Sequence, residues 1–365
     1  ASVKSGENAS DGNFKIHVLD QNGKVQEYSS RYDLHLESFE IVDANGDGVI
    51  EPGEKITLKN IKVRNTGGMP TPENHESLIF VESNGWIISN GIPVKLSHSI
   101  EPGESVTLSD QKIDFVMKDT EIKTPGERFK VGQVVSPDSM LDNVFRHFEG
   151  FQNARDVEIS FPLEITPLFA EESIAPGHQS RIYLKITNRS QKAFGKLSDL
   201  KREIALKLHL NAGDLSAKDI VYQDANGVTG DLGHGILRAI ENLAPGESAM
   251  VEGLIGVSKN APHYSSTTVR GELELGRIGA PTERRPIQMR DFKIRVAQIY
   301  EKTESSGVLL ITNHGTNRNE VESWKSMLTQ MGVGADVWDL SLNGFLALSR
   351  ELTTGSNLLK DFEGK

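Results

Sequence analysis

Twelve consecutive residues, Asp43 to Glu54, carry oxygen-bearing side chains at a spacing suited to binding a hard metal ion. Positions 1, 3, 5, 9 and 12 of this segment are Asp43, Asn45, Asp47, Glu51 and Glu54. Gly48 occupies position 6, where the EF-type calcium loop turns sharply, and the carbonyl of Val49 falls at position 7. Ca²⁺ takes about six to eight oxygen ligands. The segment therefore predicts Ca²⁺ as a cofactor, with the ligands Asp43, Asn45, Asp47, Val49, Glu51 and Glu54.

The alternative for this segment is a simple turn, because Asp, Asn and Gly all favour turns. Its four carboxylates repel one another unless a cation lies between them, which favours the metal site. The flanks do not suit the helices of an EF-hand. Residues 34–41 largely alternate in polarity, and Pro52-Gly53 ends any helix before the strand pattern at 56–58. We therefore expect an EF-type loop that joins two strands.

A Pro-Gly phrase occurs four times along the chain. Each copy has an apolar residue two positions before the proline and runs into a strand pattern. Proline sets φ for the second position of a turn, and glycine accepts the positive φ that follows. Each copy therefore predicts a turn that leads into a strand. The four copies lie at Pro52-Gly53, Pro102-Gly103, Pro176-Gly177 and Pro245-Gly246.

The first and third copies share more than the turn, since each is followed by a strand pattern that ends in asparagine, at Asn65 and at Asn188. Two consecutive β-sandwich domains explain this repeat. We expect an N-terminal tail and hairpin at 1–30, one sandwich at 31–165 and a second at 166–299. A short helix is expected within 139–151, because its apolar residues have helical spacing. Residues 197–210 suit either a helix or a strand, and a strand at 204–210 is favoured.

The segment Asp43–Glu54, together with the following strand and Asn65-Thr66-Gly67, resembles the opening of CARDB-like immunoglobulin-fold modules of bacterial cell-surface and secreted proteins. The resemblance covers about residues 40–68, and the second sandwich keeps only the Pro-Gly turn and the asparagine. It implies Ig-like sandwiches that serve as adhesion, spacer or accessory modules, usually without catalysis. Residues 169–173 lack the Asp-x-Asn-x-Asp core, so no metal is expected in the second sandwich.

Residues 300–365 have a different character. Val308 to Thr312 is a continuous apolar run, typical of a strand buried on both faces. Apolar residues at 321–331 have helical spacing, and 335–340 forms a second strand pattern. This predicts a βαβ unit with a parallel sheet. Either the unit packs on the second sandwich or the chain is cut inside a larger α/β domain. The polar loop at 313–319 is interpreted as an ordinary connection that caps the helix, in preference to an anion site.

The composition excludes several classes of function. Without cysteine, the chain has no disulfide, thiolate zinc site or cysteine nucleophile. A net charge of −11 disfavours nucleic acid as a partner. No apolar run is long enough to span a membrane. Neither a Gly-x-Ser-x-Gly nor a Walker motif is present, and the histidines lack zinc-site spacing, so no catalytic residue is predicted.

The expected fold class is therefore mainly β, with two tandem Ig-like β-sandwich domains and a C-terminal α/β unit that is either short or truncated. The leading hypothesis is a non-catalytic, calcium-stabilised spacer, adhesion or protein-interaction region of a larger protein, extracellular or at the cell surface. A protein partner is expected. One alternative is the accessory region of an enzyme whose α/β domain begins near Val308. Another is a carbohydrate-binding module with a sugar site around Trp86.

Overall fold

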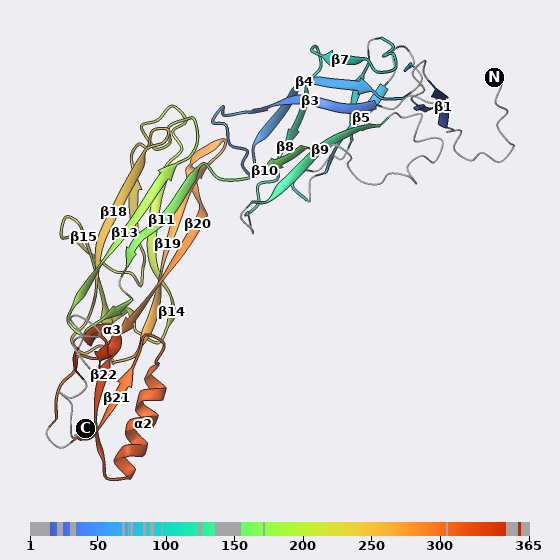
Figure 1. The fold of residues 1–365 in the computed structure, drawn as a ribbon. Helices are drawn as coiled ribbons and strands as arrows, with labels where there is room; N and C mark the ends of the chain where they lie inside the picture. The colour runs from blue at the N-terminus through green and yellow to red at the C-terminus, as the bar shows by residue number, and fades with distance from the viewer. Residues whose placement is uncertain are drawn as a thin grey trace. The chain divides into compact units, whose positions relative to one another are not determined.

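The computed structural model is mainly β, as predicted (Figure 1). The residues it describes include one helix of 13 residues and one short helical turn. It describes 15–19, 25–29, 34–303, 306–347 and 357–358, apart from gaps at 68–69, 72, 74–75, 83–84, 88–90, 97, 123–125, 136–154 and 171. The helix predicted within 139–151 lies outside the described residues. No helix of the described part of the chain is long and apolar enough to cross a membrane.

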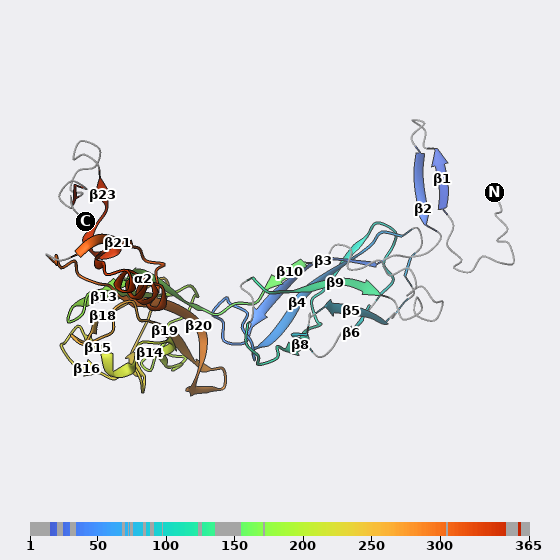
Figure 2. The ribbon, with the colours of Figure 1, turned by 90° about the horizontal axis from the view of Figure 1, so that it is seen from below.

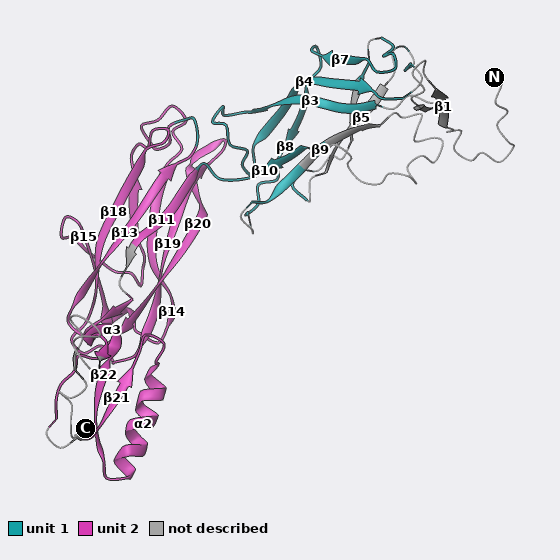
Figure 3. Ribbon diagram, in the orientation of Figure 1, with its two compact units in different colours: residues 1–162, 190–192 teal, residues 163–189, 193–365 magenta. Residues whose placement is uncertain are grey.

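The chain divides into two compact units (Figure 3). Unit 1 comprises Ala1–Pro162 and Ser190–Lys192, and unit 2 comprises Leu163–Arg189 and Ala193–Lys365. The predicted N-terminal hairpin is present in unit 1, where β1 (Lys15–Leu19) pairs antiparallel with β2 (Val25–Ser29) (Figure 2).

Besides this hairpin, the described residues of unit 1 form two antiparallel sheets. One has the order β3-β4-β7, with β8 also paired to β4; its strands are β3 (Leu34–Asp43), β4 (Lys55–Asn65), β7 (Ser105–Leu108) and β8 (Ile113–Val116). The other has the order β10-β9-β5-β6, formed by β5 (Glu76–Glu82), β6 (Gly91–Lys95), β9 (Arg128–Val135) and β10 (Arg155–Glu158). Side chains from both sheets bury one another in a single core, including Ile56, Ile61, Phe115 and Phe129. Alternating burial along β4 follows from the period of two in a strand.

Unit 2 also has two sheets, antiparallel apart from the parallel pair β12–β20, and includes longer strands. Its first sheet has the order β11-β13-β18-β15-β16, formed by β11 (Leu163–Ala170), β13 (Gln179–Asn188), β15 (Ile220–Asp224), β16 (Thr229–Gly230) and β18 (Ser248–Val257). Its second has the order β12-β20-β19-β14-β17, formed by β12 (Ser173–Ile174), β14 (Ile204–Gly213), β17 (Ile236–Ile240), β19 (Ser266–Arg277) and β20 (Ala280–Val296). The strand predicted at 204–210 is β14. A 3-10 turn, η2 (Ala217–Asp219), precedes β15.

The predicted βαβ unit is also present. Strand β21 (Ser306–Thr312) leads into helix α2 (Arg318–Gln330) and then into β22 (Gly334–Asp339), which pairs parallel with β21. The helical turn α3 (Leu340–Asn343) and a short parallel pair, β23 (Leu346–Ala347) with β24 (Asn357–Leu358), follow. The unit packs on the sandwich of unit 2. Val321 and Val337 cluster there with Tyr264, and Arg295 of β20 forms a buried ion pair with Asp339, with 2.9 Å between Nη1 and Oδ2.

All four Pro-Gly phrases form the predicted turns. The glycines have φ of +84° at Gly53, +83° at Gly103, +78° at Gly177 and +73° at Gly246. In each turn the N–H after the glycine donates to the carbonyl of the residue before the proline, as from Glu104 to Glu101 at 3.0 Å and from His178 to Ala175 at 3.0 Å. An L side chain rarely adopts this φ, which explains why glycine recurs at this position.

In each unit a buried asparagine ties the first long strand of the repeat to the second Pro-Gly turn. Asn65 Nδ2 donates to the Ile100 carbonyl at 2.9 Å, and Asn188 Nδ2 donates to the Leu243 carbonyl at 3.0 Å. The main chain of each asparagine bonds the same turn twice more. In unit 1 these bonds run from Asn65 N–H to the Glu104 carbonyl at 3.0 Å and from Gly103 N–H to the Asn65 carbonyl at 2.8 Å. We call this arrangement the asparagine clamp.

Candidate functional site

The predicted metal-binding segment forms a loop that joins β3 to β4, which confirms that it connects two strands. Asp43 is the last residue of β3 and pairs with Ile56 of β4. The Ala44 N–H donates to the Lys55 carbonyl at 3.1 Å and closes the base of the loop. We call residues 43–54 the acidic loop. Because its two ends belong to adjacent strands of one sheet, its position is fixed by the core of unit 1.

The first half of the acidic loop winds around its own side chains. The carboxylate of Asp43 accepts from the N–H of Asp47 at 2.7 Å and from that of Gly48 at 3.0 Å. Asn45 Oδ1 accepts from Asp47 N–H at 2.8 Å, and Asp47 Oδ1 accepts from Val49 N–H at 2.8 Å. These bonds satisfy main-chain donors that a tight loop cannot pair with other main-chain groups.

The second half folds back so that Glu54 closes the loop. Its Oε2 accepts from Glu51 N–H at 3.3 Å, and its Oε1 accepts from Asn45 N–H at 3.4 Å. Asp47, Glu51 and Glu54 are each 0% exposed, whereas Asp43 and Asn45 are half-buried. The structure thus gathers the five predicted side-chain ligands in one loop, and Val49 lies within it.

Burial changes the acidity of two of these carboxyl groups. Loss of hydration raises the pKa of Asp47 to about 6, with the charges of Glu51 and Asp43 adding to the rise. Loss of hydration likewise raises the pKa of Glu54 to about 8, with Glu51 and Asp47 as the charged neighbours. Hydrogen bonds from main-chain N–H groups oppose both shifts. The folded loop therefore makes ionisation of these groups costly in free energy.

The donor set fits a calcium ion in kind, since Ca²⁺ prefers carboxylate, amide and carbonyl oxygens. The arrangement nevertheless needs one adjustment. Asn45 Nδ2 donates to Asp47 Oδ2 at 3.0 Å and to Glu51 Oε1 at 3.4 Å, so this amide occupies carboxylate oxygens that a cation would use. Over the described residues, no three or more His, Asp or Glu side chains are arranged as a ready-made metal cluster. A cation would therefore require the Asn45 amide to turn away.

A cavity of about 270 Å³ lies beside Asp43, and β10 forms much of its wall. Arg155, Asp156 and Glu158 of β10 line it together with Asp43 and Gly48. Just beyond β10, Ser160 N–H donates to the Ile50 carbonyl at 3.0 Å, which holds this segment against the loop. The loop residues predicted from sequence thus have a neighbouring strand that sequence spacing did not reveal. The cavity gives solvent access to the half-buried Asp43.

The acidic loop differs from the other Pro-Gly turns in burial rather than in backbone geometry. The carboxylates of Glu104 and Glu247 also fold back onto their turns, at 2.9 Å from Glu101 N–H and 2.7 Å from Ala244 N–H. Both of these glutamates are exposed, whereas Glu54 is not. Folding back is therefore a general property of a glutamate after Pro-Gly, and the burial of Glu54 is particular to the acidic loop.

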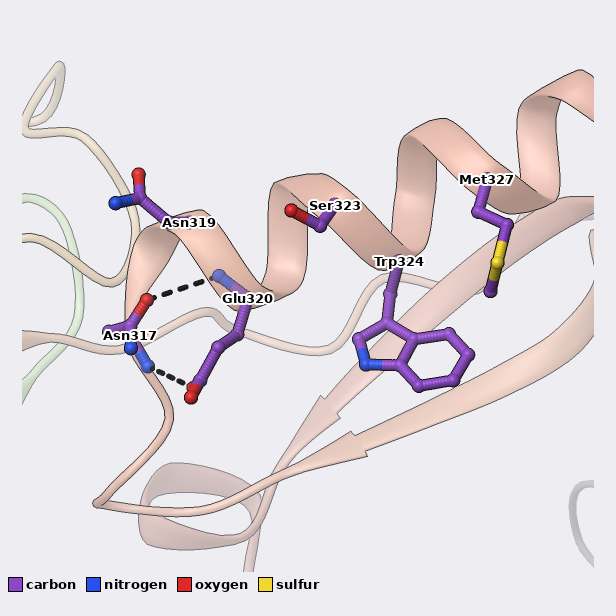
Figure 4. Close-up of a pocket in the computed structure, with 6 residues that line it drawn as sticks. All are labelled: Asn317, Asn319, Glu320, Ser323, Trp324 and Met327. Carbon is purple, nitrogen blue, oxygen red and sulfur yellow. Dashed lines mark hydrogen bonds between the residues drawn. The ribbon is translucent and has the colours of Figure 1, made fainter.

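A second surface with functional potential lies on α2 (Figure 4). A shallow pocket there is lined by Asn317, Asn319, Glu320, Ser323, Trp324 and Met327. Asn317 caps the helix by accepting from Glu320 N–H at 3.1 Å, and Glu320 returns the bond by accepting from Asn317 N–H at 2.9 Å. Trp324 is 53% exposed and Met327 43%. The pocket's carboxylate is thus engaged in capping, and its apolar groups suit contact rather than catalysis.

Trp86, the sequence candidate for a sugar platform, lies in the core of unit 1. It is 6% exposed, and its indole N–H donates to Glu127 Oε2 at 2.9 Å. Its ring therefore presents no face to solvent, which is the more usual role of a tryptophan that follows a turn.

Residues 33–161 match the model of a domain of unknown function (DUF7932). The match contains the acidic loop and the asparagine clamp of unit 1 but not unit 2. The comparison with curated proteins finds no match.

Several solved structures are similar to parts of the chain. One is AvmM, which catalyses macrocyclization in alchivemycin A biosynthesis, with 12% identity, a TM-score of 0.27 and coverage of 40% of this chain and 94% of that one. Another is Escherichia coli α2-macroglobulin activated by porcine elastase, with 15% identity, a TM-score of 0.25 and coverage of 78% and 24%. A third is a conjugative transposon lipoprotein from Bacteroides eggerthii, with 10% identity, a TM-score of 0.23 and coverage of 37% and 98%. Likenesses this low carry no conclusion about function.

Proposed function

We propose that this protein is a non-catalytic, calcium-stabilised β-sandwich module that serves as a spacer or protein-interaction region. The observation that carries the proposal is the burial of three carboxylates, those of Asp47, Glu51 and Glu54, in one loop at 0% exposure. Calcium would bind through these groups together with Asp43, Asn45 and the Val49 carbonyl. Its role would be structural, because the loop contains no nucleophile or histidine beside the acidic groups.

Physical chemistry supports a cation at this loop. Buried ionised carboxylates are unfavourable unless they are paired or bound to a metal. No lysine or arginine ion pair is present with Asp47 or Glu54 in the described residues, and their pKa values rise instead. A cation between the carboxylates would replace their repulsion with attraction. The resemblance of residues 40–68 to CARDB-like modules supports the other part of the proposal, a non-catalytic spacer or interaction module.

An extracellular or cell-surface location forms part of the proposal. Extracellular calcium modules commonly bind with dissociation constants of about 10⁻⁴ to 10⁻³ M, whereas cytosolic sensors bind more tightly. A loop whose Asn45 amide has to turn away before the cation binds is expected to belong to the weaker class. The measured affinity therefore bears on the compartment.

The protein-interaction part of the proposal is supported by α2. On this helix, Trp324 is 53% exposed and Met327 is 43% exposed. Met331, the residue that caps the end of the helix, is 68% exposed. Large apolar side chains gathered on one exposed face commonly mark a contact surface. The same face also supports the second candidate, an accessory region of an enzyme whose α/β domain begins near Val308, because an α/β domain would cover it with further elements.

The calcium proposal is tested by thermal unfolding of the purified chain in millimolar Ca²⁺ and in excess EDTA. A ligand that binds only the folded state raises the melting temperature according to its saturation. The wild type is expected to show this rise, and Asp43→Ala and Asp47→Ala are expected to abolish it.

The matched control is Asp231→Ala. Asp231 forms a similar turn, accepting from Gly233 N–H at 2.7 Å, but lies exposed and outside the acidic loop. This variant should keep the full calcium response. Equal melting temperatures of the wild type in Ca²⁺ and EDTA, with no heat of Ca²⁺ binding by calorimetry, would overturn the proposal.

A further inference from the structure

We propose that the outer face of the first sheet of unit 2 carries a binding site for a neutral sugar, centred on Tyr183. The site lies on strands β13, β15 and β18, all within unit 2. It shares no residue with the acidic loop, so the sugar proposal does not depend on the calcium proposal.

The site is a cavity of about 280 Å³ on this sheet. Cross-strand pairing places its side chains together: Tyr183 lies opposite Glu252, and Arg181 and Gln223 lie on either side of Leu254. These residues alternate with others that are buried in the core, such as Ile182 and Ile255. They therefore point to the outer face. The lining side chains used here are Arg181, Tyr183, Gln223, Asp224, Glu252 and Leu254.

The chemistry of the lining suits a sugar ring. Tyr183 and Leu254 are half-buried and supply apolar surface for the C–H face of a sugar. Arg181 Nη1 donates to Tyr183 Oη at 3.1 Å, which fixes the end of the phenol ring. Arg181 and Glu252 place a hydrogen-bond donor group and an acceptor group at the rim. Sugar hydroxyls both donate and accept hydrogen bonds, so one ligand can bond to Arg181 and to Glu252.

The charges of the cavity favour an uncharged ligand. Asp224 is already held by Arg238, with 2.8 Å between Oδ2 and Nη2, and by the N–H groups of Asn226 and Val228 at 2.9 and 2.8 Å. Arg181 and Glu252 then remain as charges of opposite sign on the same cavity. A strongly acidic or basic ligand would meet a like charge, whereas a neutral hydroxylated ligand meets none.

The cavity volume limits the ligand to a small unit. The cavity's volume of about 280 Å³ lies just below the range of about 300–1,000 Å³ for small-molecule sites. We therefore infer recognition of one or two sugar residues, as at the end or along the side of an oligosaccharide. This assigns to Tyr183 the role that the sequence suggested for Trp86, whose ring is buried.

The test uses the full chain on an array of neutral and acidic oligosaccharides, in Ca²⁺ and again in EDTA, followed by calorimetric titration with the strongest neutral oligosaccharide. Binding is expected to be equal in the two buffers. Tyr183→Ala should weaken it by at least about tenfold through loss of the ring, and Tyr183→Phe by about threefold or less.

Met250→Ala is the matched control, because Met250 is 46% exposed on the same face of β18 and does not line the cavity. It should bind like the wild type. In a Trp86→Phe, Trp324→Phe background, unfolding followed by the fluorescence of Trp338, which is buried in unit 2, shows whether each variant is folded. Three results would each overturn the proposal: no neutral oligosaccharide bound above a protein blank, binding confined to acidic oligosaccharides, or full binding by a folded Tyr183→Ala variant.

Discussion

Unit 1 and unit 2 share one framework but differ at the loop that opens it. In both units a Pro-Gly turn leads into a long strand, and that strand ends in a buried asparagine that binds a second Pro-Gly turn. At the opening turn, unit 1 buries Asp47, Glu51 and Glu54. In unit 2 the places of Glu51 and Glu54 are taken by the buried Ala175 and the exposed His178. The framework therefore forms without buried carboxylates.

This difference shows that the acidic loop is an addition to a framework that folds without it. Ala175, which matches Glu51, gains free energy by leaving water, and His178, which matches Glu54, stays exposed. Carboxylates at that place lose hydration, and their raised pKa values record the cost. Ionising buried carboxylates costs free energy in unit 1 but not in unit 2. A cation bound to the acidic loop would offset this cost.

The largest expected effects concern the feature that the units share. Asn65→Ala and Asn188→Ala each leave a buried carbonyl without its side-chain donor, so each should lower the unfolding free energy of its own unit by about 2–3 kcal/mol. Unit 1 can be followed by Trp86 fluorescence in a Trp324→Phe, Trp338→Phe background, and unit 2 by Trp338. Asn226→Ala, at an exposed turn, is the control. A large loss in one unit only would show that the two clamps are not equivalent.

The next effect concerns the buried turn glutamate. Glu54→Gln keeps one acceptor oxygen, for the N–H of either Glu51 or Asn45, in place of the two carboxylate oxygens, and removes the charge. In EDTA at pH 8 it should raise the unfolding free energy of unit 1 by about 1–3 kcal/mol, because ionising this carboxyl in the folded loop is costly. In saturating Ca²⁺ the wild type should instead have the higher unfolding free energy of the two. Chemical denaturation followed by Trp86 measures both, and a variant less stable than the wild type in EDTA contradicts the prediction.

The pH dependence of unit 1 in EDTA should follow the same carboxyl groups. The pKa values of Asp47 and Glu54 are raised to about 6 and about 8 in the folded state. Between the ordinary carboxyl range and pH 8, the folded state therefore holds protons that the unfolded state has released. Stability should then fall as the pH rises from about 4.5 to 8. Calcium affinity should rise over this range, because metal ligands bind in their ionised form. Denaturation at several pH values tests this slope, and a rise in stability with pH would refute it.

The smallest effects are expected at the exposed turn glutamates. Glu104→Gln and Glu247→Gln keep the acceptor that folds back onto the turn and change only a solvated charge, so each should alter stability by less than about 0.5 kcal/mol. Neither should change the response to Ca²⁺. If either variant changed the unfolding free energy in EDTA as much as Glu54→Gln does, turn geometry rather than burial would explain the effect of Glu54 on stability.

Much of this framework could be predicted from the sequence because it depends on local chemistry. The positive φ of the four turn glycines follows from Pro-Gly, and the βαβ unit follows from its apolar runs and helical spacing. The grouping of Asp43, Asn45, Asp47, Glu51 and Glu54 follows from their spacing in one loop. Each of these features involves residues near one another in the chain.

Features that join distant residues could not be predicted. The clamp joins residues 35 apart in unit 1 and 55 apart in unit 2, and nothing in the local pattern pairs them. The burial of Trp86 and the outward position of Tyr183 depend on how the sheets pack. The hydrogen bonds of the Asn45 amide to two carboxylates depend on side-chain orientation, which spacing does not determine.

The asparagine clamp also bears on how these units can change length in evolution. It fixes both ends of the segment that it spans, yet that segment is 35 residues long in one unit and 55 in the other. Closing a longer loop costs little additional entropy once its ends are held. We therefore expect the connections between the strands of this segment to accept insertions, or a grafted peptide, without unfolding of the sandwich.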